Sequence, residues 1–372
     1  MLLQVATQQQ GGETSLQIQQ HNHEIDPILL RAALYLCDQR TRGQVKFGPQ
    51  SDTLYFDDDG LQMASSLPVA RHRAQRFGEE CVIDLCCGVG GDLLALAERG
   101  PSIGIDIDPA RLHMATANMQ SAAAPVQLVL GDAARPPVRG AAAIADPARR
   151  RAGRRTRSGN DYEPSLSHLE AWRQQFHQLA VKVSPALALS EVPSRQEVEY
   201  VSWQGQCREA VLWFGSPVVC RRRATLIADE IHTVSSPHDE IRRPEVQPAG
   251  RFLYDPDPAL VRSHLVGELA QVMGAWLIAD EVAYLSTQAP VATPWARAFE
   301  VLQQVPFQLK SLQRLLRHNA WRPGSIRRRH FPIEPETLRR QLGRFAADAQ
   351  YVELICTRIE GKTTVFICAP VV

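Results

Sequence analysis

The chain has 372 residues, of which 44% are hydrophobic and 22% are charged, as in an ordinary globular protein rather than a disordered or fibrous one. No uninterrupted apolar run reaches the about 18 residues of a membrane span, and the amino terminus lacks the basic start of a secretory signal. The eight cysteines are scattered without a CxxC pair, which excludes a disulfide framework or cysteine zinc site and favours a cytoplasmic protein.

Charge is nearly balanced, with 41 Lys and Arg against 40 Asp and Glu, but the arginines gather locally. Clusters lie at 149–157, 221–223 and 314–344. Local basic patches on a neutral chain suit a polyanion bound at a chosen surface, whereas solvated loops and helix faces explain any single patch equally well.

The first part of the chain is predicted to hold a tail and a few helices. Residues 1–24 are rich in Gln, Gly and His, so we expect a disordered tail there, followed by a helical region over 25–78. Asp26-Pro27 predicts a helix start, with a capping Asp before a first-turn Pro. The acidic run Asp57–Gly60 lacks the alternating ligands and terminal Glu of a calcium loop, and no metal site is predicted.

From about residue 80, short apolar runs alternate with helical stretches. We expect strands over 81–85, 102–105, 126–130 and 141–145, and helices over 91–99 and 109–120. Such alternation predicts βαβ units and a mainly parallel sheet in an α/β domain over 79–231. Residues 198–203 and 208–214, on either side of Gln204-Gly205, predict an antiparallel hairpin, and 224–228 predicts a last strand.

A linker is expected over 232–250, where Pro, Ser and Gly are frequent. Beyond it, residues 251–372 are predicted to form a separate α+β module. Helices are expected over 258–276 and 337–346, and two strands over 351–369 joined at Glu360–Lys362.

The strongest chemical signal is the segment Val82–Asp92, a buried strand that ends in Asp84, then a glycine-rich turn, then a helix. Gly88 and Gly90 would let the backbone approach a ligand, and the free amides of the helix start would attract an anion. A dinucleotide site would need a third glycine where Leu93 stands, and Asp84 would repel a pyrophosphate. S-adenosylmethionine has an ammonium beside a carboxylate, so the residues favour it over a nicotinamide cofactor, with a purely structural turn as the alternative.

The ends of the next three strands carry further acids. Asp106 lies about twenty residues beyond the glycine turn, where an acid accepts hydrogen bonds from ribose hydroxyls. Ile107 and Asp108 would lie nearer the adenine. Asp132 either accepts the adenine amino group or is a cap or turn residue. Asp146 would face the sulfonium methyl and accept a proton or orient an amine, unless it is a plain Asp-Pro turn.

The stretch from Asp84 to Asp92, together with Asp106, resembles the class I S-adenosylmethionine-dependent methyltransferases. Over about 60–165 the chain is similar to the RNA cap guanine-N2 methyltransferase (trimethylguanosine synthase) type and to bacterial methyltransferases with a THUMP-like C-terminal domain. The resemblance implies a Rossmann-like sheet, S-adenosylmethionine as cofactor, and a THUMP-like module that grips RNA. It also implies that Ser65 lies against the cofactor, and Cys86 joins the cofactor-binding residues as a small packing residue rather than a nucleophile.

Amine-directed members of this group carry Asp, Asn or Ser, then Pro-Pro and an aromatic residue that stacks on the base. Here the run is Asp146-Pro147-Ala148-Arg149, without the second proline and the aromatic. Arg149 could stack on a base, or Tyr162 could return a ring from the following loop. The predicted catalytic residues are Asp146, Pro147 and Arg149.

The basic loop Arg149–Arg157 and the cluster Arg314–Arg344, which includes Trp321 and Phe331, are typical of RNA-binding surfaces. Solvated loops and amphipathic helices explain some of these arginines equally well. We therefore predict a methyltransferase that modifies a base nitrogen of RNA, with no membrane partner. The alternatives are a catalytically degenerate RNA-binding protein that keeps the cofactor fold, and a protein or small-metabolite methyltransferase.

Overall fold

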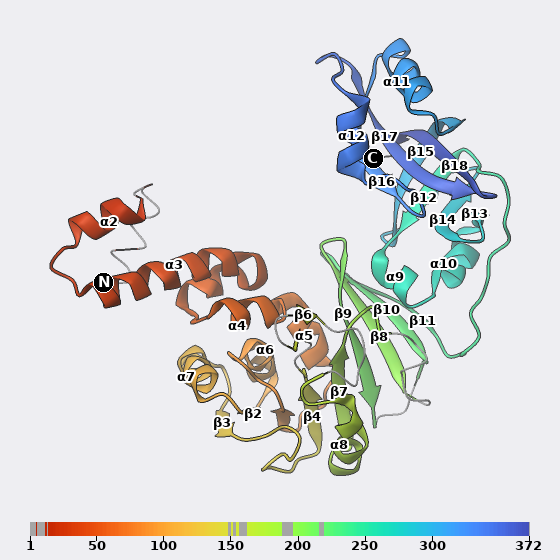
Figure 1. Ribbon diagram of the computed structural model, residues 1–372. Coiled ribbons are helices and arrows are strands. Elements are labelled where there is room, and N and C mark those ends of the chain that lie inside the picture. The colour runs from red at the N-terminus through yellow and green to blue at the C-terminus, as the bar shows by residue number, and fades with distance from the viewer. Residues whose placement is uncertain are drawn as a thin grey trace. The chain divides into compact units, whose positions relative to one another are not determined.

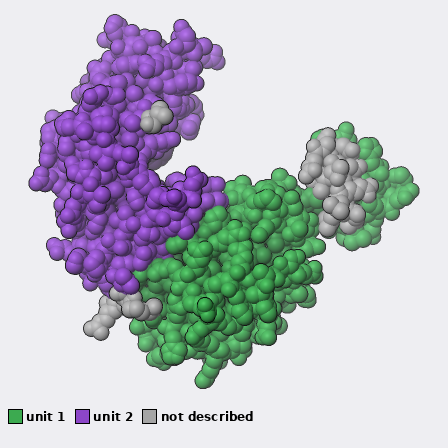
Figure 2. Space-filling view, turned by 180° about the vertical axis from the view of Figure 1, so that it is seen from behind, with its two compact units in different colours: residues 1–197, 209–218 green, residues 198–208, 219–372 purple. Residues whose placement is uncertain are grey.

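The computed structural model describes Val5, Gly12 and residues 14–147, 150–151, 154–155, 162–187, 196–215 and 219–371, with the backbone alone at 150–151 and 154–155 (Figure 1). The predicted catalytic residue Arg149 lies outside the described residues. The chain separates into two compact units, one of residues 1–197 and 209–218, the other of residues 198–208 and 219–372 (Figure 2).

The first unit begins with a helical region that matches the expectation for 25–78. Its helices are α2 (Ser15–His21), α3 (Pro27–Phe47), the 3-10 turn η1 (Gly48–Thr53), α4 (Asp58–Met63) and α5 (Leu67–Gln75). Asp26 caps α3 by accepting from the Ile28 amide at 2.7 Å, which confirms the predicted start. The Asp57 side chain caps α4 by accepting from the Gly60 amide, so the acidic run starts a helix.

Helix α2 corrects the expectation of a disordered tail over its length. Thr14 and Gln17 form a capping box, in which each side chain satisfies the other's backbone amide. Ile18 is fully buried and belongs to the same apolar cluster as Leu30 and Leu34 of α3. The segment is polar on average, but one cap and one buried side chain suffice to hold a two-turn helix against α3.

The sheet of the first unit has the order β9-β7-β4-β1-β2-β3. Its strands are β1 (Val82–Asp84), β2 (Ser102–Asp106), β3 (Val126–Leu130), β4 (Ala142–Ala145), β7 (Gln178–Val183) and β9 (Gln206–Phe214). All neighbours are parallel except β9, which runs antiparallel to β7. The mainly parallel α/β sheet predicted from the alternating pattern is confirmed, and β7 is an unpredicted member.

Helices α6 (Gly91–Arg99), α7 (Pro109–Asn118) and α8 (Leu169–Gln175) connect these strands, with the short 3-10 turn η3 (Leu166–His168) before α8. Val82, Ile144 and Ala180 of the sheet share one buried cluster with Leu93 and Leu96 of α6. Strands β1 and β4 are buried at every position, so their residues are mainly apolar instead of alternating between apolar and polar. Two short strands, β5 (Arg150–Arg151) and β6 (Arg154–Arg155), pair antiparallel within the predicted basic loop.

The second unit holds β8 (Glu197–Trp203), which runs parallel to β10 (Arg222–Ile227), while β10 runs antiparallel to β11 (Ile231–Ser236). Gln204 and Gly205 have φ angles of 52° and 69°, as the predicted hairpin turn requires. Strand β10 confirms the predicted last strand to within two residues at its start. Strand β11 is a correction, because residues 232–236 were expected in a linker. Its side chains alternate in exposure, a pattern that the polar composition hides.

The rest of the second unit is an α+β fold around a seven-stranded sheet of order β13-β14-β12-β15-β18-β17-β16. These strands are β12 (Phe252–Pro256), β13 (Trp276–Ala279), β14 (Val282–Thr287), β15 (Ala296–Pro306), β16 (Trp321–Arg328), β17 (Gln350–Ile359) and β18 (Lys362–Pro370). The helices are α9 (Pro258–Arg262), α10 (Val266–Met273), α11 (Leu309–His318) and α12 (Pro335–Leu342). The α+β class and the hairpin of β17 and β18 are confirmed.

The predicted helices of this module end earlier than expected. The helix over 258–276 is two helices and the start of a strand, because His264 takes a positive φ of 55° between α9 and α10, and left-handed Gly274 ends α10. Helix α12 ends at Gly343, whose φ is 78°. No helix in the part of the chain described above is long and apolar enough to span a bilayer.

Candidate active site

A cavity of about 670 Å³ lies in the first unit, at the carboxyl ends of β1, β2, β3 and β4. Nine of the predicted site residues line it: Ser65, Cys86, Gly88, Asp106, Ile107, Asp108, Asp132, Asp146 and Pro147. Asp84 and Gly90 are not in its wall, since Asp84 ends β1 with 1% exposure and Gly90 caps α6. Apart from Ser65, these residues lie at or after the ends of four separate strands and meet at one cavity, as the strand-end rule predicts.

The turn between β1 and α6 is held by backbone amides bonded to acids. The Gly88 amide donates to Asp106 Oδ2 at 2.7 Å, and the Cys86 amide donates to Asp84 Oδ1 at 3.2 Å. Gly90 has a φ of 87°, in the left-handed region that favours glycine. Leu93, where a dinucleotide site needs its third glycine, is fully buried in the core beneath the turn.

The two cysteines of the turn remain thiols. Burial, together with the nearby Asp84 carboxyl, raises the pKa of both Cys86 and Cys87 above the ordinary thiol value. Because the thiolate is the reactive form, neither side chain is an activated nucleophile. This agrees with the packing role expected for them.

The acids after β2 and β3 line the cavity and also accept hydrogen bonds from backbone amides. Asp106 Oδ1 accepts from the Asp108 amide at 2.9 Å, and Asp108 Oδ1 accepts from the Ala110 amide at 2.8 Å to cap α7. Asp132 Oδ1 accepts from the Ala134 amide at 2.8 Å. Asp132 is thus the turn residue that one interpretation of the sequence expected, and its side chain still lines the cavity.

Asp146 belongs to a largely buried network of charged groups at the cavity, and no ion pair of this network was predicted from the sequence. Its members come from α5, α6, β7 and β9 and from the end of β4: Arg73, Asp92, Asp146, Lys182 and Glu209. Lys182 Nζ donates to Ser65 Oγ at 2.8 Å and Arg73 donates to the same oxygen at 3.0 Å. The signals available in the sequence were Lys182 and Glu209, which are charged residues next to apolar residues of β7 and β9.

The pKa values in this network follow from burial and from the neighbouring charges. Burial raises the pKa of Asp84 well above its ordinary value, and the Asp92 carboxylate adds to this. Burial would also raise the pKa of Asp92, but the Arg73 guanidinium and the Lys182 ammonium lower it to about 2. The pKa of the buried Asp84 carboxyl therefore favours its protonated form, whereas Asp92, which lines the cavity, is firmly ionised.

Tyr162 does not provide the ring suggested for base stacking. Its side chain is 3% exposed, and its hydroxyl accepts from the Ser184 amide at 2.9 Å. The ring that does line the cavity belongs to His168, which was not expected there, beside Glu163 and Pro164. Because the Tyr162 ring is buried and its hydroxyl is bonded to the backbone, it is not exposed for stacking on a base.

A parallel sheet with an acid before a glycine turn, and further acids at the following strand ends, defines a methyltransferase of the S-adenosylmethionine-dependent class. Residues 82–145 match the family described as "Methyltransferase domain", and residues 296–370 match "THUMP domain-like". A solved structure of a putative methyltransferase from Porphyromonas gingivalis W83 has the same fold. Its TM-score is 0.80 at 19% identity, over 100% of this chain and 98% of that chain.

Two Mycobacterium tuberculosis proteins are 35% identical to the chain over 327 residues, covering 85% of this chain and 88% of each relative. Both are described as uncharacterized S-adenosylmethionine-dependent methyltransferases: MT3122 of strain CDC 1551 / Oshkosh, and Rv3037c of strain ATCC 25618 / H37Rv. The chain belongs to this family of S-adenosylmethionine-dependent methyltransferases, with a THUMP-like carboxyl-terminal domain.

The cavity has the chemical groups that S-adenosylmethionine needs. Asp106 in the cavity wall would hold the ribose, and the start of α6 would attract the carboxylate of the methionine end. Asp84, the residue just before the wall residues Leu85 and Cys86, would act on the ammonium through its charge. Ile107 leaves 72% of its surface exposed at the cavity, where an adenine ring would cover it. When bound, the cofactor supplies an electrophilic methyl group on a sulfonium, and its sulfur keeps the electron pair as the methyl–sulfur bond breaks.

Proposed function

We propose that this methyltransferase modifies RNA, at a nitrogen atom of a base. The observation that carries the RNA assignment is a basic face on α11, whose cations lack acidic partners among the described residues. The nitrogen assignment depends on Asp146, an acid at the wall of the cofactor cavity.

Asp146 follows β4 and, with Pro147, lines the same cavity as the residues expected at the cofactor. Methyl transfer is a direct displacement, so its main requirement is a nucleophile held in line at about 3–3.5 Å. A carboxylate at this place would accept a hydrogen bond from an amino group and orient the nitrogen lone pair toward the methyl carbon. It would then help the methylated nitrogen lose its proton.

Most arginines of the 314–344 cluster already have a structural role. Arg327 and Arg329 both pair with Asp255, and Arg328 pairs with Glu334. Arg339 donates to the Pro323 and Gly324 carbonyls at 3.0 Å each. Arg322 stacks on the Tyr351 ring, 3.8 Å from its centroid. These contacts stabilise the fold and leave fewer arginines for a ligand than the sequence suggested.

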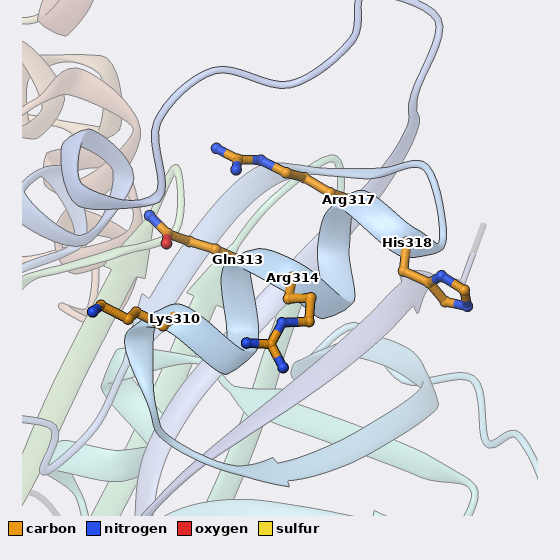
Figure 3. A pocket seen from close by; sticks show the side chains of 5 residues that line it. All are labelled: Lys310, Gln313, Arg314, Arg317 and His318. Carbon is orange, nitrogen blue, oxygen red and sulfur yellow. The ribbon is translucent and has the colours of Figure 1, made fainter.

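Several basic side chains that form no ion pair among the described residues lie together on α11, while Arg340 and Arg344 lie farther along the chain. Lys310, Arg314, Arg317 and His318 line an open hollow of about 500 Å³ together with Gln313 (Figure 3). Lys310, Arg314 and Arg317 follow one another by four and three residues, so they share one side of the helix, about one turn apart. A row of cations at this spacing suits the phosphates of a nucleic acid strand.

The buried side of α11 favours RNA over a lipid surface. Leu312 and Leu316 are 1% and 0% exposed in the core of the second unit. A helix that lies on a membrane needs a free apolar face to insert, and α11 has already buried its own. A basic surface of this kind has no evident use for a small metabolite. The THUMP-like match over 296–370 agrees with an RNA-gripping role.

Three measurements test the proposal. Calorimetry with S-adenosylmethionine and with its demethylated product should register binding to the purified full chain. Tritiated S-adenosylmethionine should then label total RNA, and nucleoside mass spectrometry should place the label on a base nitrogen. Binding without transfer to RNA would favour the degenerate RNA-binding protein, and label in protein or small metabolites instead of RNA would reject the RNA assignment.

A further inference from the structure

Lys182 is a buried cation near the end of β7 that the proposed chemistry does not yet use. Its side chain is 6% exposed. Its ammonium donates to Ser65 Oγ at 2.8 Å and to Asp92 Oδ2 at 3.3 Å, and it forms an ion pair with Asp146 Oδ2. Three acceptors therefore converge on one nitrogen, which matches the three N–H donors of a lysine.

The sheet register brings Lys182 to Asp146. Ala145 of β4 pairs with Val181 of the parallel strand β7, so the next residue along each chain lies at the same edge of the sheet. Asp92 in the first turn of α6 and Ser65 before α5 reach the same ammonium. Lys182 thus connects the side of the cavity that holds the glycine turn with the acid expected to meet the substrate.

Lys182 is a fixed cation. Burial disfavours its ammonium, but the carboxylates of Asp146 and Asp92 outweigh burial and raise the pKa of Lys182 above its ordinary value. The Arg73 guanidinium lowers the pKa of Lys182, and the Glu209 carboxylate raises it further. Because the ammonium keeps its proton in neutral solution, Lys182 can position a neighbour but cannot act as a base.

Stabilising Asp92 does not explain why a second cation is buried here. The Arg73 guanidinium already pairs with Asp92 as well as with Glu209. Among the described residues, by contrast, Lys182 is the one cation that forms an ion pair with Asp146. The contact that distinguishes Lys182 is therefore the one to the acid in the cavity wall.

We propose that Lys182 is a positioning residue for Asp146, which it holds by Oδ2 so that Oδ1 faces the cavity as an acceptor for the substrate. The Asp146 side chain is 21% exposed and lines the cavity, and no described residue donates to Oδ1. A fixed carboxylate oxygen accepts a hydrogen bond from an amino group and repels an anionic nucleophile. The inference rests on the proposed function, and it narrows the substrate to a group that carries a hydrogen on its nucleophilic atom.

The test uses Lys182→Met in the full chain, with Lys182→Gln as a second variant if the first does not fold. A crystal structure of the variant should show the Asp146 carboxylate turned away from its wild-type orientation. The kcat of methyl transfer to RNA should fall about 100-fold, as expected when a reacting group is misplaced by about 1 Å, with a smaller change in KM. Lys182→Arg keeps the charge and should restore part of kcat and the Asp146 orientation.

Arg73→Gln is the matched control, because it removes a cation of the same network that interacts with Asp146 through its charge but makes no hydrogen bond to it. It should lower thermal stability but keep the Asp146 orientation. A folded Lys182→Met protein with unchanged Asp146 orientation and unchanged kcat would overturn the inference. If the wild type transfers no methyl group to RNA, the proposed function fails, while the crystal structures still decide whether Lys182 positions Asp146.

Discussion

Asp84 is the residue at which burial and ligand chemistry meet most directly. It is 1% exposed, and its carboxyl group accepts a hydrogen bond from the Cys86 amide. One backbone amide offsets little of the cost of burying a carboxylate, so the group favours its proton, as its raised pKa indicates. The ammonium of a bound amino-acid moiety would supply a positive charge beside it and allow the carboxylate to form.

Cofactor binding should therefore depend on pH through Asp84. Its folded-state pKa is raised, so the stability it contributes is full below the unfolded pKa and is lost as pH rises through the folded pKa. A bound ammonium offsets that loss. We expect the affinity for S-adenosylhomocysteine, measured by calorimetry, to increase up to about tenfold per pH unit until the folded pKa is reached.

Asp84→Asn provides the control for this pH dependence. The amide has nearly the same size but cannot ionise, so the variant should bind the cofactor more weakly and with an affinity that changes little with pH. An unchanged pH profile in Asp84→Asn would assign the titration to another group, and an affinity independent of pH in the wild type would contradict the role given to Asp84.

At the scale of elements, the sequence predicted those strands and helices whose pattern follows from local burial. Strands β1 to β4 are short apolar runs and α6 has a clear start and a glycine end, so both were visible. Strand β7 was missed because Lys182 interrupts its apolar run, and the partners that make this lysine tolerable come from α6 and from the end of β4. A charged residue inside a buried strand can be explained only when the residues that pair with it in the folded structure are known.

Helix α11 was recognised only as part of a basic cluster, although its apolar residues carried a helical signal. Leu309, Leu312 and Leu316 recur at spacings of three and four, and Leu312 and Leu316 are buried in the core with Leu338 of α12. The same ten residues therefore carry an apolar face for folding and a basic face for a ligand. This division makes the two functions of the helix separable by mutation.

Leu316→Ala should destabilise the second unit without altering the basic face. Removing a fully buried leucine side chain costs about 2–5 kcal/mol, since apolar packing is removed and part of a cavity remains. Urea unfolding of the full chain should show this loss in the transition that reports the second unit. Ser311→Ala, at an exposed position of the same helix, should change the free energy of unfolding by less than about 0.5 kcal/mol. Equal effects of the two variants would contradict the packing assigned to Leu316.

At the scale of the whole molecule, the candidate site was easier to predict than the network that supports it. Asp106, Asp132 and Asp146 were found because parallel strands present their carboxyl ends at one edge, a rule that needs only the strand assignments. Arg73 and Glu209 are 136 positions apart, and the sequence around either residue contains no pattern that predicts their ion pair. Two units fold from one chain, and each contributes a different part of the proposed activity: a cofactor cavity and a basic surface.

The last prediction concerns RNA binding by the full chain through the basic face of α11. Replacing Lys310, Arg314 and Arg317 with alanine removes three cations from the basic face of α11. If each neutralises a phosphate of single-stranded RNA, the slope of log affinity against log salt should become shallower by about 2, at about 0.7 for each phosphate that is no longer neutralised.

The control replaces Arg221, Arg251 and Arg328, which already pair with Asp239, Glu300 and Glu334, and changes the net charge equally. Fluorescence anisotropy over a range of salt concentrations gives both slopes. An equal change in the control would reduce the effect to net charge and remove α11 as the RNA-binding surface, whereas a change confined to the α11 variant assigns the phosphates to that helix.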